Sequence, residues 1–157
     1  MTVPKKLVGN MNASGLKIAI VASRFNNLLV EKLVEGAIDA LERNGANTKD
    51  LTIAWVPGAW EIPLATKKLA KTKKYDGIVC IGALIKGSTQ HFEYVAGEAV
   101  KGVAQVSLET GLPVTMGILT TENLAQAIER SGATMGNQGF NAAVAVIELC
   151  NLLKHVE

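Results

Sequence analysis

The sequence predicts a flavodoxin-like, three-layer α/β/α domain built around a four-stranded parallel sheet. Short apolar runs rich in β-branched residues alternate with stretches of helical periodicity along the 157 residues. Strands joined by helical crossovers pair in parallel, and helices then cover both faces of the sheet. No linker, repeat or low-complexity segment interrupts the pattern. We therefore expect a single domain over residues 1–157, with residues 1–16 as an extended N-terminal segment.

Four apolar runs have the length and composition of strands. They cover residues 17–23, 51–57, 77–82 and 113–120, and read KIAIVAS, LTIAWVP, GIVCIG and PVTMGILT. Each run is too short for a buried helix and is bounded by turn or polar residues, so the strand interpretation is favoured.

Helical spacing follows each of these runs. In the first helix Leu33, Ala37 and Leu41 recur on one face, and Gly45 is placed to end the helix after Asn44. Further helices are expected over residues 62–73, 91–110, 122–131 (capped by Thr121) and 140–155. The last helix is apolar nearly all round, which predicts that its outer side meets another subunit.

Composition favours a homo-oligomer. Only 19% of the residues are charged and the mean hydropathy is +0.24, values explained by apolar surface buried between subunits. The net charge of +2 gives no indication of a nucleic-acid partner. The lysines within residues 67–74 lack interleaved aromatic residues, so a solvated helix face is the favoured interpretation.

The chain also has the features of a cytoplasmic protein. Its start lacks the apolar region of a secretion signal, and no apolar run is long enough to span a membrane. Cys80 and Cys150 stand far apart in apolar surroundings, which is typical of buried thiols in a reducing compartment. No grouping of Cys, His and Asp has the spacing of a metal site.

Ligands of parallel sheets bind beyond the carboxyl ends of the strands, and the loop after the third strand is the most unusual one there. Gly82 and Gly87 have the spacing of a phosphate-binding loop, but Ser88 stands where its lysine belongs. A glycine loop that leads into a helix suits a phosphate ester, and Ser88 and Thr89 add hydroxyl donors. His91 could act there as a general acid or base. The alternative is a capped helix start with a solvated histidine.

Two further loops carry candidate ligand-binding side chains. Glu61 beside Trp60 could bind the hydroxyls of a polyol, although an ordinary helix start with an acidic first turn explains Glu61 equally well. Phe25 could stack on a flat heterocycle or fold back into the core. Arg130, at a predicted helix C-terminus, could bind a phosphate or simply stabilise the helix dipole.

Five motifs together resemble one family. They are RFN after the first strand, WVPGAWEIP after the second, GALIKGSTQHFEYV after the third, GILTTEN after the fourth and AIERSG near the end. Their order and spacing are similar to those of lumazine synthases over essentially the whole chain. The resemblance implies a transferase of riboflavin biosynthesis. It condenses 5-amino-6-(D-ribitylamino)uracil with 3,4-dihydroxy-2-butanone 4-phosphate, releasing phosphate and water, and needs neither metal nor organic cofactor.

The resemblance also implies roles for individual residues. Stacking on the pyrimidine is assigned to Phe25, binding of the ribityl chain to Ala59, Trp60 and Glu61, and the uracil pocket to Ala83, Leu84 and Ile85. The butanone phosphate is assigned to Ser88, Thr89 and Arg130. His91 is the proton-transfer residue, and Met116 forms an apolar wall.

This sequence departs from the family at three positions. The family commonly has phenylalanine at Met116, lysine at Gln138 and arginine at Lys86. Methionine keeps the wall apolar. Loss of a lysine beside the pyrimidine is expected to weaken substrate binding or shift specificity, while the type of reaction stays the same.

Family resemblance further implies assembly into pentamers, and into capsids of twelve pentamers in many members. The spacing of residues 130–139 matches the capsid-forming members. Riboflavin synthase is a further partner that the resemblance suggests. In the family, Met116 and Arg130 belong to the neighbour of the subunit that supplies the first three loops. Two other classes remain open from the sequence: a non-catalytic flavin- or lumazine-binding protein, and a capsid scaffold.

Overall fold

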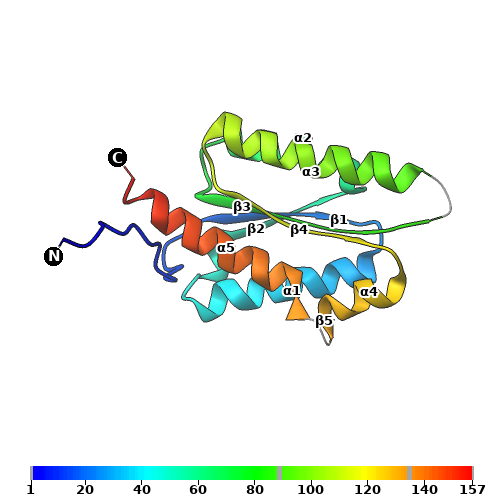
Figure 1. Cartoon of the computed structure of the whole chain (residues 1–157), viewed down its shortest axis with the longest axis horizontal. Coiled ribbons are helices and arrows are strands. Elements are labelled where there is room, and N and C mark those ends of the chain that lie inside the picture. The colour runs from blue at the N-terminus through cyan, green and yellow to red at the C-terminus, as the bar shows by residue number, and fades with distance from the viewer. Residues whose placement is uncertain (1, 88–89, 134–135, 157) are drawn as a thin grey trace.

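The structure is a computed structural model that describes residues 2–87, 90–133 and 136–156. Four parallel strands form its central sheet in the order β2-β1-β3-β4 (Figure 1). The strands are β1 (Ile18–Ser23), β2 (Leu51–Val56), β3 (Gly77–Ile85) and β4 (Val114–Thr121). Helices cover both faces, so the predicted flavodoxin-like architecture is confirmed.

The helices divide between the two faces of the sheet. α1 (Asn27–Arg43), α4 (Leu124–Glu129) and α5 (Gln138–Leu153) lie on one face, and α2 (Ile62–Lys71) and α3 (His91–Thr110) lie on the other (Figure 1). Two single-turn 3₁₀ helices, η1 (Thr48–Asp50) and η2 (Ala59–Glu61), flank β2.

The core follows from the alternation of side chains along the central strand. In β1, Ile18 and Ile20 point toward α1 and α5, whereas Ala19 and Val21 point toward α2 and α3. Every residue of β1 is buried, as expected for a strand with a neighbour on each side and a helix layer on each face. β2 is an edge strand, and its Trp55 is 38% exposed.

Several boundaries differ from the sequence expectations. β3 continues to Ile85, three residues beyond its predicted end, because its last residues pair with β4. Thr121 is the last residue of β4 and does not cap α4. Asn123 does so, and its side chain accepts a hydrogen bond from the backbone N–H of Gln126 at 2.9 Å.

A small antiparallel hairpin, absent from the sequence expectations, joins α4 to α5. Its strands are β5 (Ser131–Ala133) and β6 (Gly136–Asn137). α5 therefore begins at Gln138, with Asn137 as its cap: the Asn137 side chain accepts from the N–H of Phe140 at 2.9 Å and donates to the carbonyl of Lys32 at 2.9 Å.

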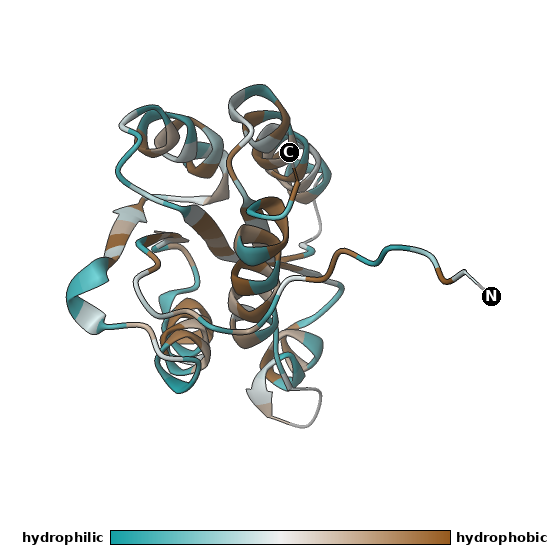
Figure 2. Cartoon of the chain, turned by 90° about the vertical axis from the view of Figure 1, so that its left-hand side faces the viewer, coloured by the Kyte–Doolittle hydropathy of each residue, from teal (hydrophilic) through white to brown (hydrophobic). Residues whose placement is uncertain are grey.

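The chain's own N-terminal segment covers part of the outer side of α5. Residues 2–13 form no helix or strand, and the first of them extend away from the body of the molecule (Figure 2). The side chain of Asn151 donates to the carbonyls of Asn10 at 2.8 Å and Asn12 at 2.9 Å. Gly9 approaches the backbone of α5 so closely that a Cβ there would collide with Glu148. Part of the outer side of α5, which the sequence assigned to another subunit, is therefore covered by the chain itself.

Candidate active site

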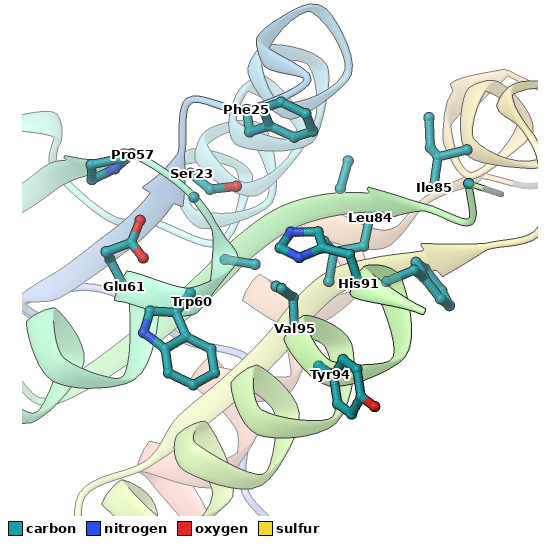
Figure 3. A pocket seen from close by; sticks show the side chains of 15 residues that line it. Ser23, Phe25, Pro57, Trp60, Glu61, Leu84, Ile85, His91, Tyr94 and Val95 are labelled. Carbon is teal, nitrogen blue, oxygen red and sulfur yellow. The ribbon is translucent and has the colours of Figure 1, made fainter. Parts of the chain in front are cut away.

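A cavity of about 710 Å³ lies beyond the carboxyl ends of β1, β2 and β3, beside the N-terminus of α3 (Figure 3). It is lined by Ser23, Phe25, Pro57, Gly58, Ala59, Trp60, Glu61, Ala83, Leu84, Ile85, Gly87, His91, Phe92, Tyr94 and Val95. Parallel sheets bind ligands at this position because the strand ends converge there and leave their loops free for recognition.

Phe25 faces this cavity and does not fold back into the core. Its side chain is 68% exposed. The backbone N–H of Phe25 donates to the carbonyl of Pro57 at 3.1 Å, which fixes the loop against the end of β2. Asn26 then adopts a left-handed conformation (φ 62°), and its side-chain amide donates to the carbonyl of Ala83 at 2.8 Å. These bonds hold an apolar ring at the mouth of the cavity, where a flat ligand can stack on it.

The segment after β2 turns sharply and carries Trp60 and Glu61 to the cavity. The N–H of Glu61 donates to the carbonyl of Gly58 at 3.2 Å, which closes the single turn of η2. Trp60 is 59% exposed, whereas Ala59 is buried and Glu61 is half-buried. A half-buried carboxylate next to an exposed indole gives this side of the cavity both a hydrogen-bond acceptor and an apolar wall.

The third side of the cavity is strand, not the loop that the sequence predicted. Ala83, Leu84 and Ile85 continue β3 and pair with residues 119–121 of β4. Ala83 is buried and Leu84 and Ile85 are half-buried. Pairing to neighbouring strands fixes this backbone, so its position does not depend on a bound ligand.

His91 is the first residue of α3, and its imidazole points into the cavity (Figure 3). Gly87 also lines this cavity. Ser88 and Thr89, which the sequence nominates for phosphate binding, lie outside the described residues. The N-terminus of a helix of this length carries the positive end of the helix dipole, which favours an anionic group beside His91.

Met116 and Arg130 line a different cavity of the same chain. This second cavity, of about 370 Å³, lies along the edge strand β4 and beside α4, and it shares no lining residue with the first. Met116 is 47% exposed, and Arg130 is the C-terminal cap of α4. Gln138 also lines this cavity, and its N–H donates to the carbonyl of Arg130 at 2.9 Å.

Comparison with known families decides the identity of this arrangement. The sequence model of 6,7-dimethyl-8-ribityllumazine synthase matches residues 15–154 of the 157. The chain belongs to this family. It is therefore a transferase of riboflavin biosynthesis with small-molecule substrates, and its reaction is lumazine synthesis from the ribitylaminouracil and the butanone phosphate. A purely carrier or scaffold role is not favoured.

Two separate groups contain the described residues to which the family resemblance assigns a role. Phe25, His91, residues 59–61 and residues 83–85 gather in the first cavity. Met116 and Arg130 do not join them within one chain.

Sequence reasoning missed several residues of the first cavity. Tyr94 and Val95 lie one helical turn after His91, at spacings of three and four residues, so helical periodicity alone could have found them. The sequence places Ser23 at the end of the first strand and at the start of the ligand-end loop over residues 23–27, but gives it no ligand-binding role, and Asn26 appears only as part of a motif. No pattern in the sequence indicated that the Asn26 amide holds the end of β3.

Within the described part of the chain, no helix combines the length and the apolar character needed to cross a membrane. Residues 2–87, 90–133 and 136–156 also contain no cluster of three His, Cys, Asp or Glu side chains that could hold a metal ion.

Proposed function

We propose that the first cavity binds the ribitylaminouracil, that the loop before α3 binds the butanone phosphate, and that His91 transfers protons between them. One observation carries this proposal. A single cavity gathers an exposed aromatic ring, a half-buried carboxylate, the backbone of a strand end and an imidazole. These groups match the chemical parts of the pyrimidine substrate and the proton transfers of its condensation.

The pyrimidine fits the side of the cavity between Phe25 and the end of β3. A flat ring stacks on the exposed face of Phe25, and the uracil edge meets backbone groups of residues 83–85. The ribityl chain then lies along residues 59–61, where the Glu61 carboxylate accepts hydrogen bonds from its hydroxyls. Ala59 and Trp60 contribute a backbone group and an apolar surface.

The phosphate ester fits the start of α3. Gly87 and the helix N-terminus offer a place for an anion beside His91. We assign Ser88 and Thr89 to the same group on the basis of the family motif. Arg130 completes the assignment, because a guanidinium matches the geometry of a phosphate and stays charged at every relevant pH.

The chemistry requires little more than positioning and one proton carrier. The primary amine of the pyrimidine attacks the ketone, and water is lost as the imine forms. Holding amine and ketone together can supply about 7–11 kcal/mol of the barrier. An imidazole that accepts and returns protons in these steps contributes about 10²–10⁴-fold.

We further propose that the complete site is shared between two copies of the chain. Met116 and Arg130 lie on the edge strand and α4, in a cavity separate from that of His91. Phe25 and Trp60 are exposed at the mouth of the first cavity, as expected for residues that a neighbouring copy covers. A neighbour that brings Arg130 to the His91 cavity would place the guanidinium near the phosphate. Gln138 would arrive with it.

This arrangement requires a homo-oligomer. We propose a cytoplasmic pentamer and, beyond it, a capsid of twelve pentamers, on the basis of the spacing of residues 130–139 and the family resemblance. Riboflavin synthase is the proposed further partner, because it consumes the lumazine product.

Turnover tests the proposed function. The purified protein is mixed with both substrates, and the absorbance and fluorescence of the lumazine product are followed against a mixture without protein. We expect product to form at a rate proportional to protein concentration. Binding of the pyrimidine without turnover would instead support a carrier, and neither binding nor turnover would support a scaffold.

A further inference from the structure

Ser23, the last residue of β1, is an exception among the buried polar side chains of the described residues. The Ser23 residue as a whole is only 1% exposed. The other buried polar residues each make a hydrogen bond through the side chain: Thr66 to Ile62, Thr121 to Asn123, Ser131 to Ile128 and Asn151 to Asn10. No such bond joins the Ser23 hydroxyl to another described residue. The Ser23 hydroxyl therefore keeps its capacity to donate and accept a hydrogen bond available to a group outside the described chain.

The hydroxyl of Ser23 opens into the first cavity. No fully buried side-chain oxygen or nitrogen in the described chain lacks a hydrogen-bond partner. The Ser23 oxygen, which has none, must therefore keep some contact with solvent. Ser23 lines the large cavity, and its side chain points into it (Figure 3). The cavity is thus the place where this hydroxyl can meet a ligand.

Two neighbouring strands fix where the hydroxyl lies. On one side, Ser23 pairs with Val56 of β2, directly before the segment that carries Glu61. On the other side is Gly82 of β3, directly before residues 83–85. A Cβ at Gly82 would come within 2.9 Å of the Ser23 oxygen, so glycine leaves the room that the hydroxyl occupies. The hydroxyl therefore lies on the cavity floor between the proposed ribityl and uracil sides.

A polyol needs partners of both kinds at such a junction. Each ribityl hydroxyl is both a donor and an acceptor, whereas an ionised Glu61 can only accept. A serine hydroxyl can donate to one ribityl oxygen or accept from it, which complements the carboxylate. Building on the proposed function, we infer that Ser23 is a substrate-binding residue whose hydroxyl forms a hydrogen bond with the ribityl chain of the pyrimidine substrate.

The proposed role of Ser23 also predicts how Ser23→Ala affects the stability of the unliganded protein. Replacing a serine whose hydroxyl is bonded in the folded protein costs stability, but Ser23→Ala removes a hydroxyl that has no partner in the unliganded protein. Ser107→Ala is the matched control, because the Ser107 hydroxyl on α3 donates to the carbonyl of Leu112 at 2.7 Å and lies outside the cavity. We expect an unchanged or higher melting temperature for Ser23→Ala and a lower one, by about 2–5 °C, for Ser107→Ala.

The binding test uses two unreactive analogues of the pyrimidine substrate, each with a nitro group in place of the 5-amino group. One carries the D-ribityl chain, and the other carries a pentyl chain without hydroxyls. Calorimetric titration gives the Kd of both analogues for the wild-type protein, Ser23→Ala and Ser107→Ala. We expect Ser23→Ala to weaken the ribityl analogue by about three- to tenfold and to leave the pentyl analogue unchanged. Ser107→Ala should change neither.

A substitution on the neighbouring strand β3 affects the same hydroxyl. Gly82→Ala places a methyl group against the Ser23 oxygen and displaces it. It should weaken the ribityl analogue as Ser23→Ala does, and the double variant should bind no more weakly than Gly82→Ala alone.

The outcomes separate the inference from the proposed function. Equal weakening of both analogues by Ser23→Ala, or no weakening of either, would overturn the role of Ser23 while the wild-type protein still binds the ribityl analogue. Failure of the wild-type protein to bind that analogue would overturn the proposed function, and the inference with it.

Discussion

His91, to which we assign proton transfer, is the first residue of α3 and lies in the wall of the first cavity. His91→Ala should lower kcat by about 10–10³-fold, because proton transfer supplies only part of the acceleration and positioning supplies the rest. Steady-state kinetics on the purified variant measure this. His155→Ala is the matched control, since this second histidine is exposed near the C-terminus. Wild-type turnover by a folded His91→Ala protein would remove the imidazole from the mechanism.

Cys80 is a buried thiol whose ionisation is linked to the stability of the fold. Burial raises the pKa of its thiol from 9.0 to about 12, against the opposing effect of the hydrogen bond with Thr66. Well below pH 9 the thiol is neutral in both the folded and the unfolded chain. Between pH 9 and about 12 the unfolded chain ionises first, so the stability that the buried thiol contributes is lost as the pH rises.

Cys80→Ala makes this measurable. The substitution should lower the free energy of unfolding at pH 8 by about 1–2 kcal/mol through lost packing, and the deficit relative to the wild-type protein should shrink between pH 9 and 10.5. Urea unfolding of both proteins at pH 8 and at pH 10.5 measures the deficit and its change with pH. A deficit that grows with pH would show that the sign of this linkage is wrong.

Much of the site could be predicted at this scale, because its residues follow strand ends in recognisable motifs. Phe25, Glu61 and His91 lie together as the motifs predict, although the sequence could not decide whether Phe25 faces ligand or core. That choice depends on the bond from Asn26 to Ala83, which joins residues far apart in the chain. The proposed role of Ser23 could not be predicted for a similar reason, since only the structure shows that its hydroxyl forms no hydrogen bond with another described residue.

At the scale of elements, Asn137 connects three parts of the fold. Its side chain caps α5 through the N–H of Phe140, donates to the carbonyl of Lys32 on α1, and lies against Gly36 of the same helix. Asn137→Ala loses the cap and leaves the Lys32 carbonyl without this donor, so it should cost about 2–3 kcal/mol.

Asn123→Ala is the matched substitution for comparison. Asn123 caps only the short helix α4, through the N–H of Gln126, so the cost should be about 0.5–1.5 kcal/mol. Urea unfolding of both variants tests the ranking. An equal loss in the two proteins would mean that Asn137 acts as a simple helix cap.

Sequence periodicity predicts the main helices and strands well, but it does not predict the residues at which they end. Buried strands and long amphipathic helices have strong patterns, so all four strands of the main sheet and the long helices lie where the sequence predicts them. β3 extends further because pairing with β4 continues past Gly82, and pairing is a tertiary effect that local patterns do not contain. The hairpin of β5 and β6 is too short to have a pattern at all.

At the scale of the whole molecule, the single chain leaves apolar surface without a partner. Ile53 and Trp55 on the edge strand β2 are each 38% exposed, and Met116 on the opposite edge strand is 47% exposed. Exposed apolar edge strands are places where protein chains associate. The low fraction of charged residues predicts association, whereas the proposed number of copies rests on the family resemblance and the spacing of residues 130–139.

Light scattering coupled to size exclusion measures the assembly. We expect at least five times the mass of one chain, and sixty times that mass if the pentamers close into a capsid. The assembly should persist at high salt, because apolar contacts are not screened. A monomer at micromolar concentration would contradict both the pentamer and the shared site.

The most direct test of the account asks whether the two cavities of the chain are halves of one site. His91→Ala and Arg130→Ala proteins, each expected to have strongly lowered activity alone, are unfolded, mixed in equal amounts and refolded together. A site is then intact where an Arg130→Ala chain supplies His91 and a His91→Ala neighbour supplies Arg130. Each condition is met in half of random cases, so about a quarter of wild-type activity should return. No gain over the separately refolded variants, with mixed assembly confirmed by mass, would place all of the chemistry within one chain.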